Sequence, residues 1–339
     1  GWLWTATTDA HRGAWRGVQE TSERLGEPVF QSLSDSEVAR RAGSPKHLEG
    51  VLEASNATVQ PARLVRGLRR VALEKGVRIF ENTPMLSLDR GQPAVIRTPD
   101  GELRAPKVVM ATNAWAAAIP ELRRTILPVT STVVATAPIP ERLEQIGWTG
   151  GEAVTDSQLM VDYYRTTRDG RIAFGKGTGM ISFASRIDES YDHNPQLNDD
   201  TEQDLRRTYP QLHDVPVTHS WSGPIDRTYD SLPVFGHLNG APHIVYGIGW
   251  SGNGVGPSRL GGRILASLAL GLDDEWSRCG LVGRQSKRFP LEPLRYIGGL
   301  MVRGAVQRKE QAEAQNRMGA WLDRILAGFA PAGLEDKDL

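Results

Sequence analysis

The 339-residue sequence has little cysteine, no excess of either charge and no long hydrophobic run. Its single cysteine, Cys279, excludes a disulfide within the chain, and the seven scattered histidines show no zinc-type spacing. A reducing compartment therefore fits best, and we expect a cytoplasmic protein. Forty basic residues balance forty acidic ones, which argues against nucleic acid as the main partner. The apolar runs are too short to span a bilayer.

The sequence also lacks an initiator methionine and a signal-peptide pattern. It opens at Gly1 directly on the strand-like run Trp2–Thr7. We therefore expect a fragment of a longer chain. The length predicts two domains, and the 36 glycines cluster late, where the backbone must approach something closely.

Strand and helix patterns interleave along the chain, which predicts a mixed α/β fold. An amphipathic helix is expected from Pro61 to Gly76, with Leu64, Leu68, Val71 and Ala72 on one face. Further expected elements are a strand at 77–80, a hairpin turn at 98–101, a buried strand at 107–111, β-rich segments at 128–136 and 158–176, a helix at 200–209, a strand at 215–221, a strand at 243–246, a helix at 257–270 and a basic helical tail at 281–330.

A glycine-rich loop follows the strand at 243–246. Gly247, Gly249 and Gly252 match the G-x-G-x-x-G fingerprint of a dinucleotide-binding turn. That interpretation, which would favour a nicotinamide-dependent dehydrogenase, is rejected. Asp273 and Asp274 lie about 20 residues on, at the fingerprint's acidic position, but no apolar strand precedes them.

The alternative is a loop that packs against a planar ring. Glycines at Gly249, Gly252, Gly254 and Gly256 would let the backbone lie flat on the ring. The helix from Pro257 would point its positive end at the negative edge of a reduced flavin. A tight turn without any ligand is the simpler reading of the same residues.

With three further stretches this loop resembles the D-amino-acid-oxidase superfamily of FAD enzymes, whose members include glycine, sarcosine and gamma-glutamylputrescine oxidases. The four stretches, in order, are Ala57–Pro61, Val108–Trp115, Trp221–Gly236 and His243–Gly256. The resemblance implies oxidation of a C–N bond by hydride transfer to flavin N5, which gives an imine that hydrolyses. The family's own pyrophosphate-binding turn would then lie upstream of Gly1.

The resemblance also implies a domain plan. An FAD-binding Rossmann-like domain, here without its N-terminal βαβ unit, would combine with an antiparallel β-rich substrate domain. We expect substrate-domain elements at 1–56, part of the FAD-binding domain at 57–120, the β-rich substrate domain at 121–222, the flavin loop and its helix at 223–275, and a basic helical tail at 276–339.

Cofactor contacts are carried over from the family by position. Trp115 has a second reading as a packed core aromatic. Asp230, Pro233 and Gly236 are expected to shape a neighbouring loop, with Asp230 accepting backbone hydrogen bonds. The expected FAD contacts are Pro84, Met85, Ala111, Thr112, Trp115, Gly249, Trp250, Gly252, Asn253, Gly254, Val255 and Gly256.

Substrate residues are expected on the β-rich segment. Strand alternation puts Tyr163 and Arg165 on one face and Tyr164 on the other. The Tyr163 ring can hold an ammonium by a cation–π contact, or it can simply pack in the sheet. Lys176 ends the next strand and is, with Tyr163 and Arg227, a candidate catalytic residue. Ala173, however, occupies the place of the lysine that assists oxygen in sarcosine-oxidase-like members.

A second departure concerns substrate charge. Glycine-oxidase-like members hold the substrate carboxylate with an arginine, and Ile225 stands at that place here. Arg227 can substitute, or the substrate is an amine that needs no clamp, which is the reading we favour. The electron acceptor would be oxygen or another molecule. A non-catalytic flavin-binding subunit of the same fold is the competing hypothesis.

The tail between Arg284 and Lys309 carries seven basic residues and one acid, Glu292. One reading places it on an anionic membrane surface as a peripheral contact. The other is a solvated helix packed on the body of the protein.

Overall fold

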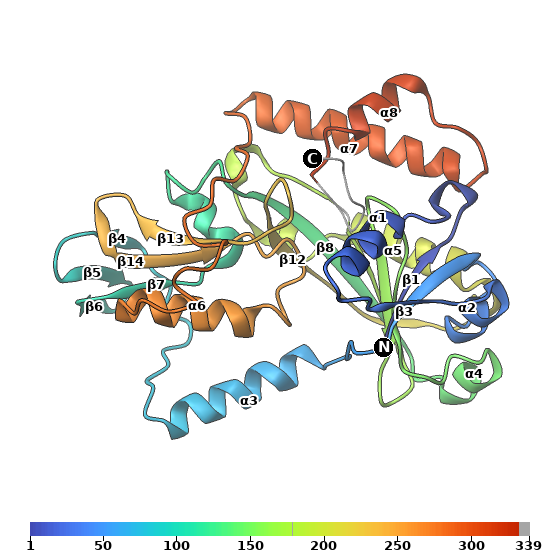
Figure 1. Cartoon of the computed structure of the whole chain (residues 1–339), viewed down its shortest axis with the longest axis horizontal. Coiled ribbons are helices and arrows are strands. Elements are labelled where there is room, and N and C mark those ends of the chain that lie inside the picture. Colours follow the sequence, from blue (N-terminus) through green and yellow to red (C-terminus); the bar gives the residue numbers. More distant parts are fainter. Residues whose placement is uncertain (178, 332–339) are drawn as a thin grey trace. The chain divides into compact units, whose positions relative to one another are not determined.

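The computed structural model describes residues 1–177 and 179–331, which form two compact units (Figure 1). Unit 1 comprises Gly1–Thr58, Leu127–Ile225 and the chain from Phe289 onward, and unit 2 comprises Val59–Ile126 and Asp226–Arg288. Helices and strands alternate through the chain, so the predicted mixed α/β class is confirmed. The finer domain plan stays a prediction.

An eight-stranded sheet forms the centre of unit 1, in the order β12-β8-β11-β10-β9-β1-β3-β2. β1 and β9 pair in parallel, whereas β8, β11, β10 and β9 follow one another antiparallel. The strands are β1 (Trp2–Ala6), β2 (Phe30–Ser32), β3 (Glu49–Glu53), β8 (Leu127–Thr136), β9 (Ala153–Thr155), β10 (Asp162–Thr166), β11 (Ile172–Lys176) and β12 (Val217–Arg227), whose last two residues belong to unit 2.

Helix α5 covers part of this sheet. Asn194 caps its first turn by accepting a hydrogen bond from the Leu197 amide. Leu205 and Tyr209 from this segment pack with Tyr164 and Phe174 of the sheet in the main core of the unit. The helices of unit 1 are η1 (Asp9–His11), α1 (Arg16–Arg24), α2 (Asp35–Arg41), α4 (Pro140–Gln145), η3 (Phe183–Ser185), η4 (Glu189–Tyr191), α5 (Pro195–Thr208), η5 (Pro210–Leu212), α7 (Leu294–Glu313) and α8 (Trp321–Ala327).

Unit 2 contains two three-stranded sheets, β13-β14-β7 and β4-β5-β6. In the first, β13 and β14 form an antiparallel hairpin and β7 joins β14 in parallel. Helix α6 packs on it through Ile264 and Leu265, against Phe235 and Val245. The elements are α3 (Pro61–Glu74), β4 (Ser87–Asp89), β5 (Ala94–Thr98), β6 (Gly101–Ala105), β7 (Val108–Met110), η2 (Asn113–Ala118), β13 (Val234–Leu238), β14 (Ala241–Ile248) and α6 (Ser258–Leu270).

Local signals predicted several elements correctly. The helix that starts at Pro61, the hairpin between β5 and β6 and the helix after the glycine loop are all present. The strand expected at 77–80 is wrong, since these residues pair with no neighbour. The tail is helical only from Leu294, because residues 276–293 form turns and irregular backbone.

The apolar face of α3 has no covering element among the described residues. The helix has no buried residue, and Leu68 on its apolar face is 61% exposed. Leu64 and Val71 on the same face are exposed as well. The sequence therefore predicted the amphipathic helix correctly, but no element of the described chain packs on its apolar face.

Candidate functional site

The glycine-rich loop after β14 takes a backbone conformation that favours glycine. Gly249 and Gly252 have φ of +84° and +92°, and Ser251 between them has a φ of +54°. A Cβ atom at Gly249 would lie 2.4 Å from Cγ2 of Thr228, so even alanine would clash at this position. The shape of the loop therefore depends on its glycines.

Asp226, which sequence reasoning missed, holds this loop by its backbone. Its carboxylate accepts hydrogen bonds from the amides of Gly249 at 2.6 Å and Trp250 at 3.0 Å. The residue is only 1% exposed, and burial raises its pKa to about 6 although the loop amides oppose that shift. The one sequence signal that could have identified it is an aspartate near the end of strand β12, within the family-like stretch Trp221–Gly236.

The Trp250 ring turns onto helix α6. It packs edge-on against Phe235, with ring centroids 5.7 Å apart. A Cβ atom at Gly261 would come within 2.3 Å of the Trp250 ring, so a small residue there lets the ring lie against the helix. Trp250 thus anchors the loop to α6, and its contact with a flavin stays a prediction.

The segment just before α6 leaves several amides available. Ser258 donates its backbone N–H to the Gly254 carbonyl at 2.9 Å, which starts the helix. Within the described chain, the amides of Gly252, Val255 and Gly256 donate to no acceptor. A Cβ at Gly256 would meet only open space. Free amides at a helix N-terminus suit a negatively charged ligand edge.

The segment after α6 does not build a second nucleotide-binding strand. Residues 271–283 form turns, and Val282 makes only an isolated bridge with Phe235. Asp274 accepts hydrogen bonds from the amides of Trp276 and Ser277 and from the Ser267 hydroxyl. This acid therefore orders a local turn, as expected from the rejection of the fingerprint.

The other expected cofactor contacts also belong to unit 2. Ala111, Pro84 and Met85 are exposed. Trp115 is 55% exposed, so its alternative reading as a core aromatic is wrong. Thr112 follows β7, and its buried hydroxyl oxygen has no hydrogen-bond partner within the described chain. That orphaned hydroxyl suits a polar group of a ligand.

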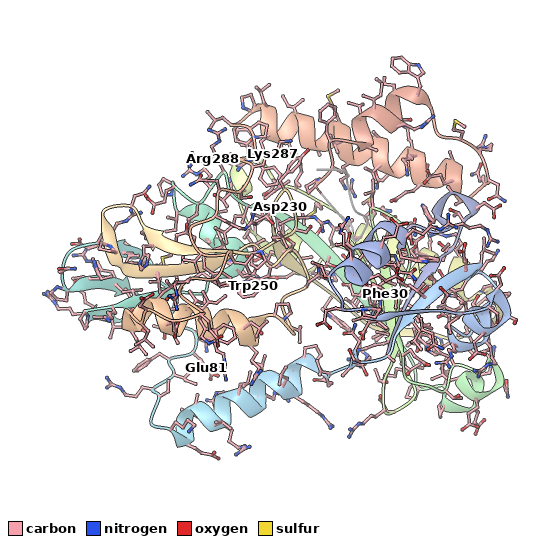
Figure 2. All side chains as sticks on the ribbon, in the orientation of Figure 1. Phe30, Glu81, Asp230, Trp250, Lys287 and Arg288 are labelled. Carbon is pink, nitrogen blue, oxygen red and sulfur yellow. The ribbon has the colours of Figure 1, made fainter. Side chains whose placement is uncertain are left out.

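Asp230 orders the neighbouring loop before β13 as expected, whereas Gly236 lies within strand β13. Asp230 (labelled in Figure 2) accepts a hydrogen bond from the Leu232 amide at 3.2 Å. It also pairs through both carboxylate oxygens with Arg284, at 2.7 Å and 3.0 Å. Arg284 further donates to the Pro233 carbonyl at 2.8 Å. Sequence reasoning missed Arg284, because 54 residues separate it from its partner.

The substrate candidates on β10 alternate as predicted. Tyr164 is buried, stacks on Phe174 with centroids 4.7 Å apart and shares a hydrogen bond with His47 at 3.1 Å. Tyr163 lies on the other face, where its hydroxyl shares a hydrogen bond of 2.6 Å with Ser131. Burial raises the Tyr163 pKa, so the hydroxyl stays protonated.

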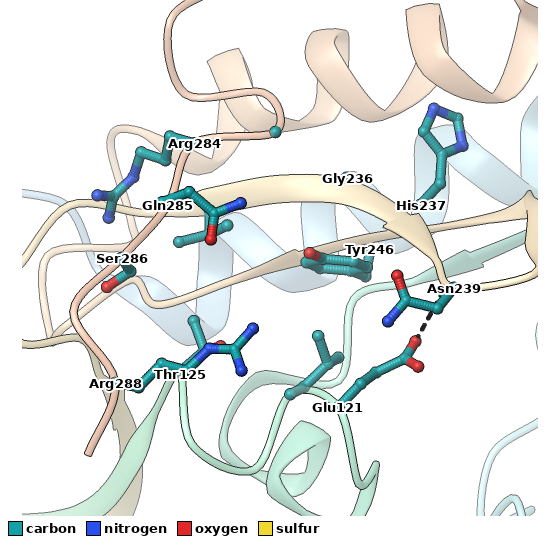
Figure 3. A pocket seen from close by; sticks show the side chains of 13 residues that line it. Glu121, Thr125, Gly236, His237, Asn239, Tyr246, Arg284, Gln285, Ser286 and Arg288 are labelled. Carbon is teal, nitrogen blue, oxygen red and sulfur yellow. Dashed lines mark hydrogen bonds between the residues drawn. The ribbon is translucent and has the colours of Figure 1, made fainter.

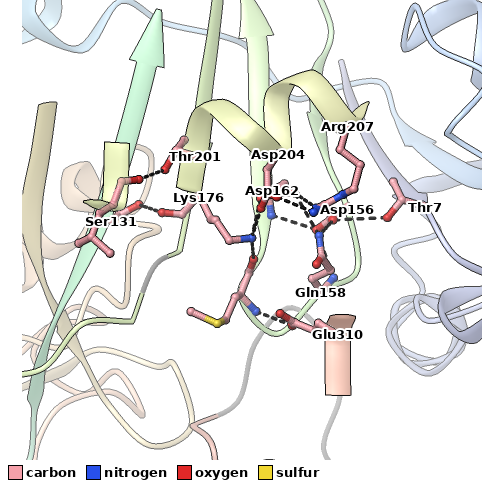
Figure 4. A network of polar contacts seen from close by, with 12 residues as sticks. Thr7, Ser131, Asp156, Gln158, Asp162, Lys176, Thr201, Asp204, Arg207 and Glu310 are labelled. Carbon is pink, nitrogen blue, oxygen red and sulfur yellow. Dashed lines mark hydrogen bonds and ion pairs between the residues drawn. The ribbon is translucent and has the colours of Figure 1, made fainter. Parts of the chain in front are cut away.

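Lys176 lies in a buried ionic network of unit 1 (Figure 4). Its ammonium contacts Asp204 at 2.5 Å and Asp162 at 3.1 Å. Arg207 pairs with the same two aspartates, at 2.5 Å from Asp204 and 3.4 Å from Asp162. Burial alone would lower the pKa of Lys176, but the two carboxylates raise it above its ordinary value. Two strong ion pairs therefore hold its side chain, and its catalytic role stays a prediction.

Asp162 of this network is buried, at 2% exposure. Burial raises its pKa to about 8, even though Lys176 acts in the opposite direction. Arg227, the remaining catalytic candidate, ends β12 in unit 2, and burial lowers its pKa. The structure thus distributes the three catalytic candidates over both units.

A separate cavity of about 210 Å³ lies in unit 2 (Figure 3). Tyr246 and Gly236 of the β13–β14 hairpin line one side, and Glu121, Thr125 and Arg288 line others. Glu121 is already engaged, because it pairs with Arg90 at 3.1 Å and accepts from the Asn239 amide. No residue of the glycine loop lines this cavity.

The described residues contain neither a metal-binding cluster nor a membrane-spanning helix. No cluster of three or more His, Cys, Asp or Glu residues in this part of the chain is placed to hold a metal ion. Across the same residues, every helix is too short or too polar to cross a bilayer.

Comparison with known protein families shows to which family the chain belongs. Residues 1–268 match the family described as FAD dependent oxidoreductase. The chain belongs to this family. The match includes the glycine loop, Asp226 and the β-rich strands, and it stops within α6. The resemblance to the D-amino-acid-oxidase superfamily is therefore confirmed.

Individual relatives agree with this assignment. The chain is 29% identical over 265 residues to the probable oxidoreductase OrdL of Haemophilus influenzae, an alignment that spans 76% of this chain and 58% of that protein. It is also 29% identical over 277 residues to gamma-glutamylputrescine oxidoreductase of Escherichia coli, spanning 80% and 62% respectively. The chain thus spans about three fifths of the length of these relatives.

Solved structures show the same fold. Glycine oxidase from Geobacillus kaustophilus superposes with a TM-score of 0.70 at 21% identity, over 84% of this chain and 74% of that one. L-proline dehydrogenase from P. horikoshii superposes with a TM-score of 0.64 at 19% identity, over 80% and 73%. At this level of identity the likeness shows the fold alone.

Proposed function

We propose that this chain forms part of an FAD-dependent oxidoreductase that oxidises the C–N bond of an amine or amino acid. The observation that carries the proposal is the loop at 249–256, whose backbone Asp226 fixes from inside the unit. Burial of the Asp226 carboxylate raises its pKa and costs free energy. A buried carboxylate that only holds loop amides is therefore easier to explain if the loop has to keep one shape to bind a ligand.

The residues present fit a flavin ring. The amides of Gly252, Val255 and Gly256 would face the negative edge of the ring at the start of α6. The glycines keep side chains off the ring plane, and the orphaned Thr112 hydroxyl supplies a further hydrogen-bonding group. When bound, the flavin accepts a hydride from the carbon next to the substrate nitrogen.

Tyr163 of unit 1 and Arg227 of unit 2 are separate substrate candidates. We propose that the Tyr163 ring binds the substrate ammonium by a cation–π contact. Ile225 replaces the carboxylate-clamping arginine of glycine-oxidase-like members, so an amine suits this chain better than an α-amino acid. The relative named for gamma-glutamylputrescine also points to an amine. If the substrate does carry a carboxylate, Arg227 is the residue to pair with it.

Oxygen or another molecule would take the electrons from the reduced cofactor. The ammonium of Lys176 is bound by Asp162 and Asp204, so it is not available to assist oxygen. We therefore favour an acceptor other than oxygen. The same observation, together with Ile225, supports a second candidate function, a flavin-binding subunit of this fold without catalytic activity.

A visible spectrum of the purified protein separates these functions. Bands near roughly 370 and 450 nm report oxidised flavin. Their anaerobic bleaching by a polyamine, and not by glycine, is the expected result. Flavin bands that no amine or amino acid bleaches would favour the non-catalytic subunit. A colourless protein that binds NAD would overturn both.

The loop assignment has its own test in Gly252→Val, with Gly240→Val as the matched control. Both glycines have positive φ, +92° and +69°, so both substitutions strain the backbone similarly. Gly240 lies in the β13–β14 turn, away from the loop. We expect only Gly252→Val to abolish flavin retention. Retention by both variants would overturn the placement of the ring on this loop.

A further inference from the structure

Helices α7 and α8 lie beyond the family match, which ends at residue 268. They pack on each other and are fixed to unit 1 (Figure 1). Val306 of α7 and Ala327 of α8 are buried with Met160. Glu310 of α7 accepts a hydrogen bond from the Met160 amide at 2.9 Å. The two helices therefore form an ordered attachment to the shared fold.

Each of these helices also has large apolar side chains that are exposed. On α7, Leu294, Ile297 and Met301 follow helical spacing and are 70%, 53% and 54% exposed. On α8, Trp321 and Ile325 are 71% and 52% exposed. We call these residues, with Met318, Leu322 and Phe329, the α7–α8 apolar face; all of them are exposed. Clustered exposure of this kind marks an interaction surface.

Within residues 289–331, the exposed charges without a partner of opposite sign are basic. Between residues 289 and 331 the described chain has four acids, and each is paired or buried: Glu292, Glu310, Glu313 and Asp323. Arg317 and Arg324 are exposed, and no carboxylate in the described chain pairs with either. Among the described residues 289–331, this face therefore offers apolar and cationic groups, and no acid of that segment is both exposed and unpaired.

Most of the basic residues that stand out in the sequence do not contribute to this charge. Arg295 pairs with Glu292, Lys309 with Glu313 and Arg308 with Asp323. Arg284 pairs with Asp230, and Lys287 lies 4.0 Å above the Tyr229 ring. Basic composition therefore does not by itself support a membrane contact. The stronger argument for such a contact is the exposed α7–α8 apolar face.

We propose that the α7–α8 apolar face lies on the surface of an anionic lipid bilayer. Trp321 and the neighbouring aliphatic side chains would enter the interface, where an amphipathic aromatic ring is favoured. Arg317 and Arg324 would attract anionic headgroups. A second copy of the chain fits less well, because a two-fold interface would bring the same arginines together without acids to pair them. This inference is independent of the proposed function.

Vesicle sedimentation with the whole protein tests the proposal. The probes are vesicles of phosphatidylcholine alone and of phosphatidylcholine mixed with phosphatidylglycerol. We expect binding to the mixed vesicles, weakened by added salt because the charged part is screened. The double variant Trp321→Ser/Ile325→Ser should bind at least about tenfold more weakly. Arg317→Glu/Arg324→Glu should lose about tenfold or more, and chiefly on anionic vesicles.

The matched control is Val65→Ser/Leu68→Ser on α3. These side chains are 63% and 61% exposed, so the control removes similar exposed apolar surface elsewhere. It should bind as the unchanged protein does, and circular dichroism should show every variant folded. No binding to either vesicle, or equal binding by the Trp321→Ser/Ile325→Ser variant, overturns the proposal. So does a dimer, seen by light scattering, that this variant alone abolishes.

Discussion

The glycine loop of unit 2 and the ionic network of unit 1 each bury an aspartate, but they stabilise it in opposite ways. Asp226 is held by backbone amides and leaves the loop exterior open to a ligand. Asp162 is held by the cations of Lys176 and Arg207. Burial raises the pKa of both, to about 6 and about 8. The first arrangement shapes a surface for binding, whereas the second satisfies its own charges internally.

This difference predicts where a substitution affects stability and where it affects ligand binding. In the network every charged group has a partner, so loss of one cation leaves buried charge behind. In the loop, loss of the carboxylate leaves amides without an acceptor and lets the backbone move. Network variants should therefore change the free energy of unfolding most, and loop variants should change flavin retention most.

The largest expected effect is that of Lys176→Met. It removes the ammonium that contacts Asp162 and Asp204, and breaking a buried ion pair costs about 3–5 kcal/mol. We expect the free energy of unfolding, measured with urea, to fall by that amount at neutral pH.

Arg70→Met is the control for this loss. Arg70 pairs with Glu74 at 2.6 Å, but both side chains are more than half exposed. An exposed pair of this kind contributes about 0.3–0.5 kcal/mol. If Lys176→Met were no more destabilising than Arg70→Met, the network would not be structural, and a catalytic role for Lys176 would regain support.

The next effect is that of Asp226→Ala on the loop. The change leaves the amides of Gly249 and Trp250 without their acceptor, and each unsatisfied buried amide costs about 1–3 kcal/mol. We expect flavin retention to fall about tenfold or more, measured by equilibrium dialysis. Asp230→Ala serves as the comparison, since Asp230 orders the neighbouring loop with Arg284. Equal losses from both variants would mean that neither aspartate acts specifically on the flavin loop.

The pH dependence of Asp226 sharpens the same comparison. Its folded pKa of about 6 lies above the ordinary value of 3.8, so the folded state binds the proton more strongly. The stability contribution of Asp226 is thus present below pH 3.8 and is lost as pH rises to 6, by about 3 kcal/mol at roughly 1.4 kcal/mol for each pH unit. Asp226→Asn should remove this slope from the urea unfolding free energy.

Flavin retention should show the opposite pH trend. Protonation of Asp226 weakens its acceptance of the two loop amides, so retention should fall as pH drops through about 6. Asp226→Asn should retain flavin equally poorly on both sides of that pH. A wild-type profile that stays flat between pH 5 and 7 would contradict this role for Asp226.

Sequence reasoning identified what depends on local spacing. The α6 helix, the hairpin at 98–101 and the alternation of Tyr163 and Tyr164 follow from neighbouring residues alone. Asp226, Arg284 and the partners of Lys176 were missed, because their contacts join residues 14 to 54 positions apart. The basic tail misled for a related reason, since ion pairs engage four of its seven basic residues, some with acids on the same helix and others with acids farther along the chain. Charge counts from sequence do not reveal which charges remain exposed.

The smallest expected effect concerns Tyr163, which follows Asp162 on β10. Variants at this position distinguish a structural role from a substrate-binding role. Tyr163→Phe loses the hydrogen bond to Ser131 and should lower the free energy of unfolding by about 1 kcal/mol. The ring remains, so KM for an amine should change little.

Tyr163→Leu removes the ring and should raise KM about fivefold, the equivalent of about 1 kcal/mol of cation–π attraction. Tyr164→Phe, on the buried face, should affect stability alone. A KM that follows the hydroxyl and not the ring would mean that Tyr163 binds substrate as a hydrogen-bond donor, which would overturn the cation–π assignment.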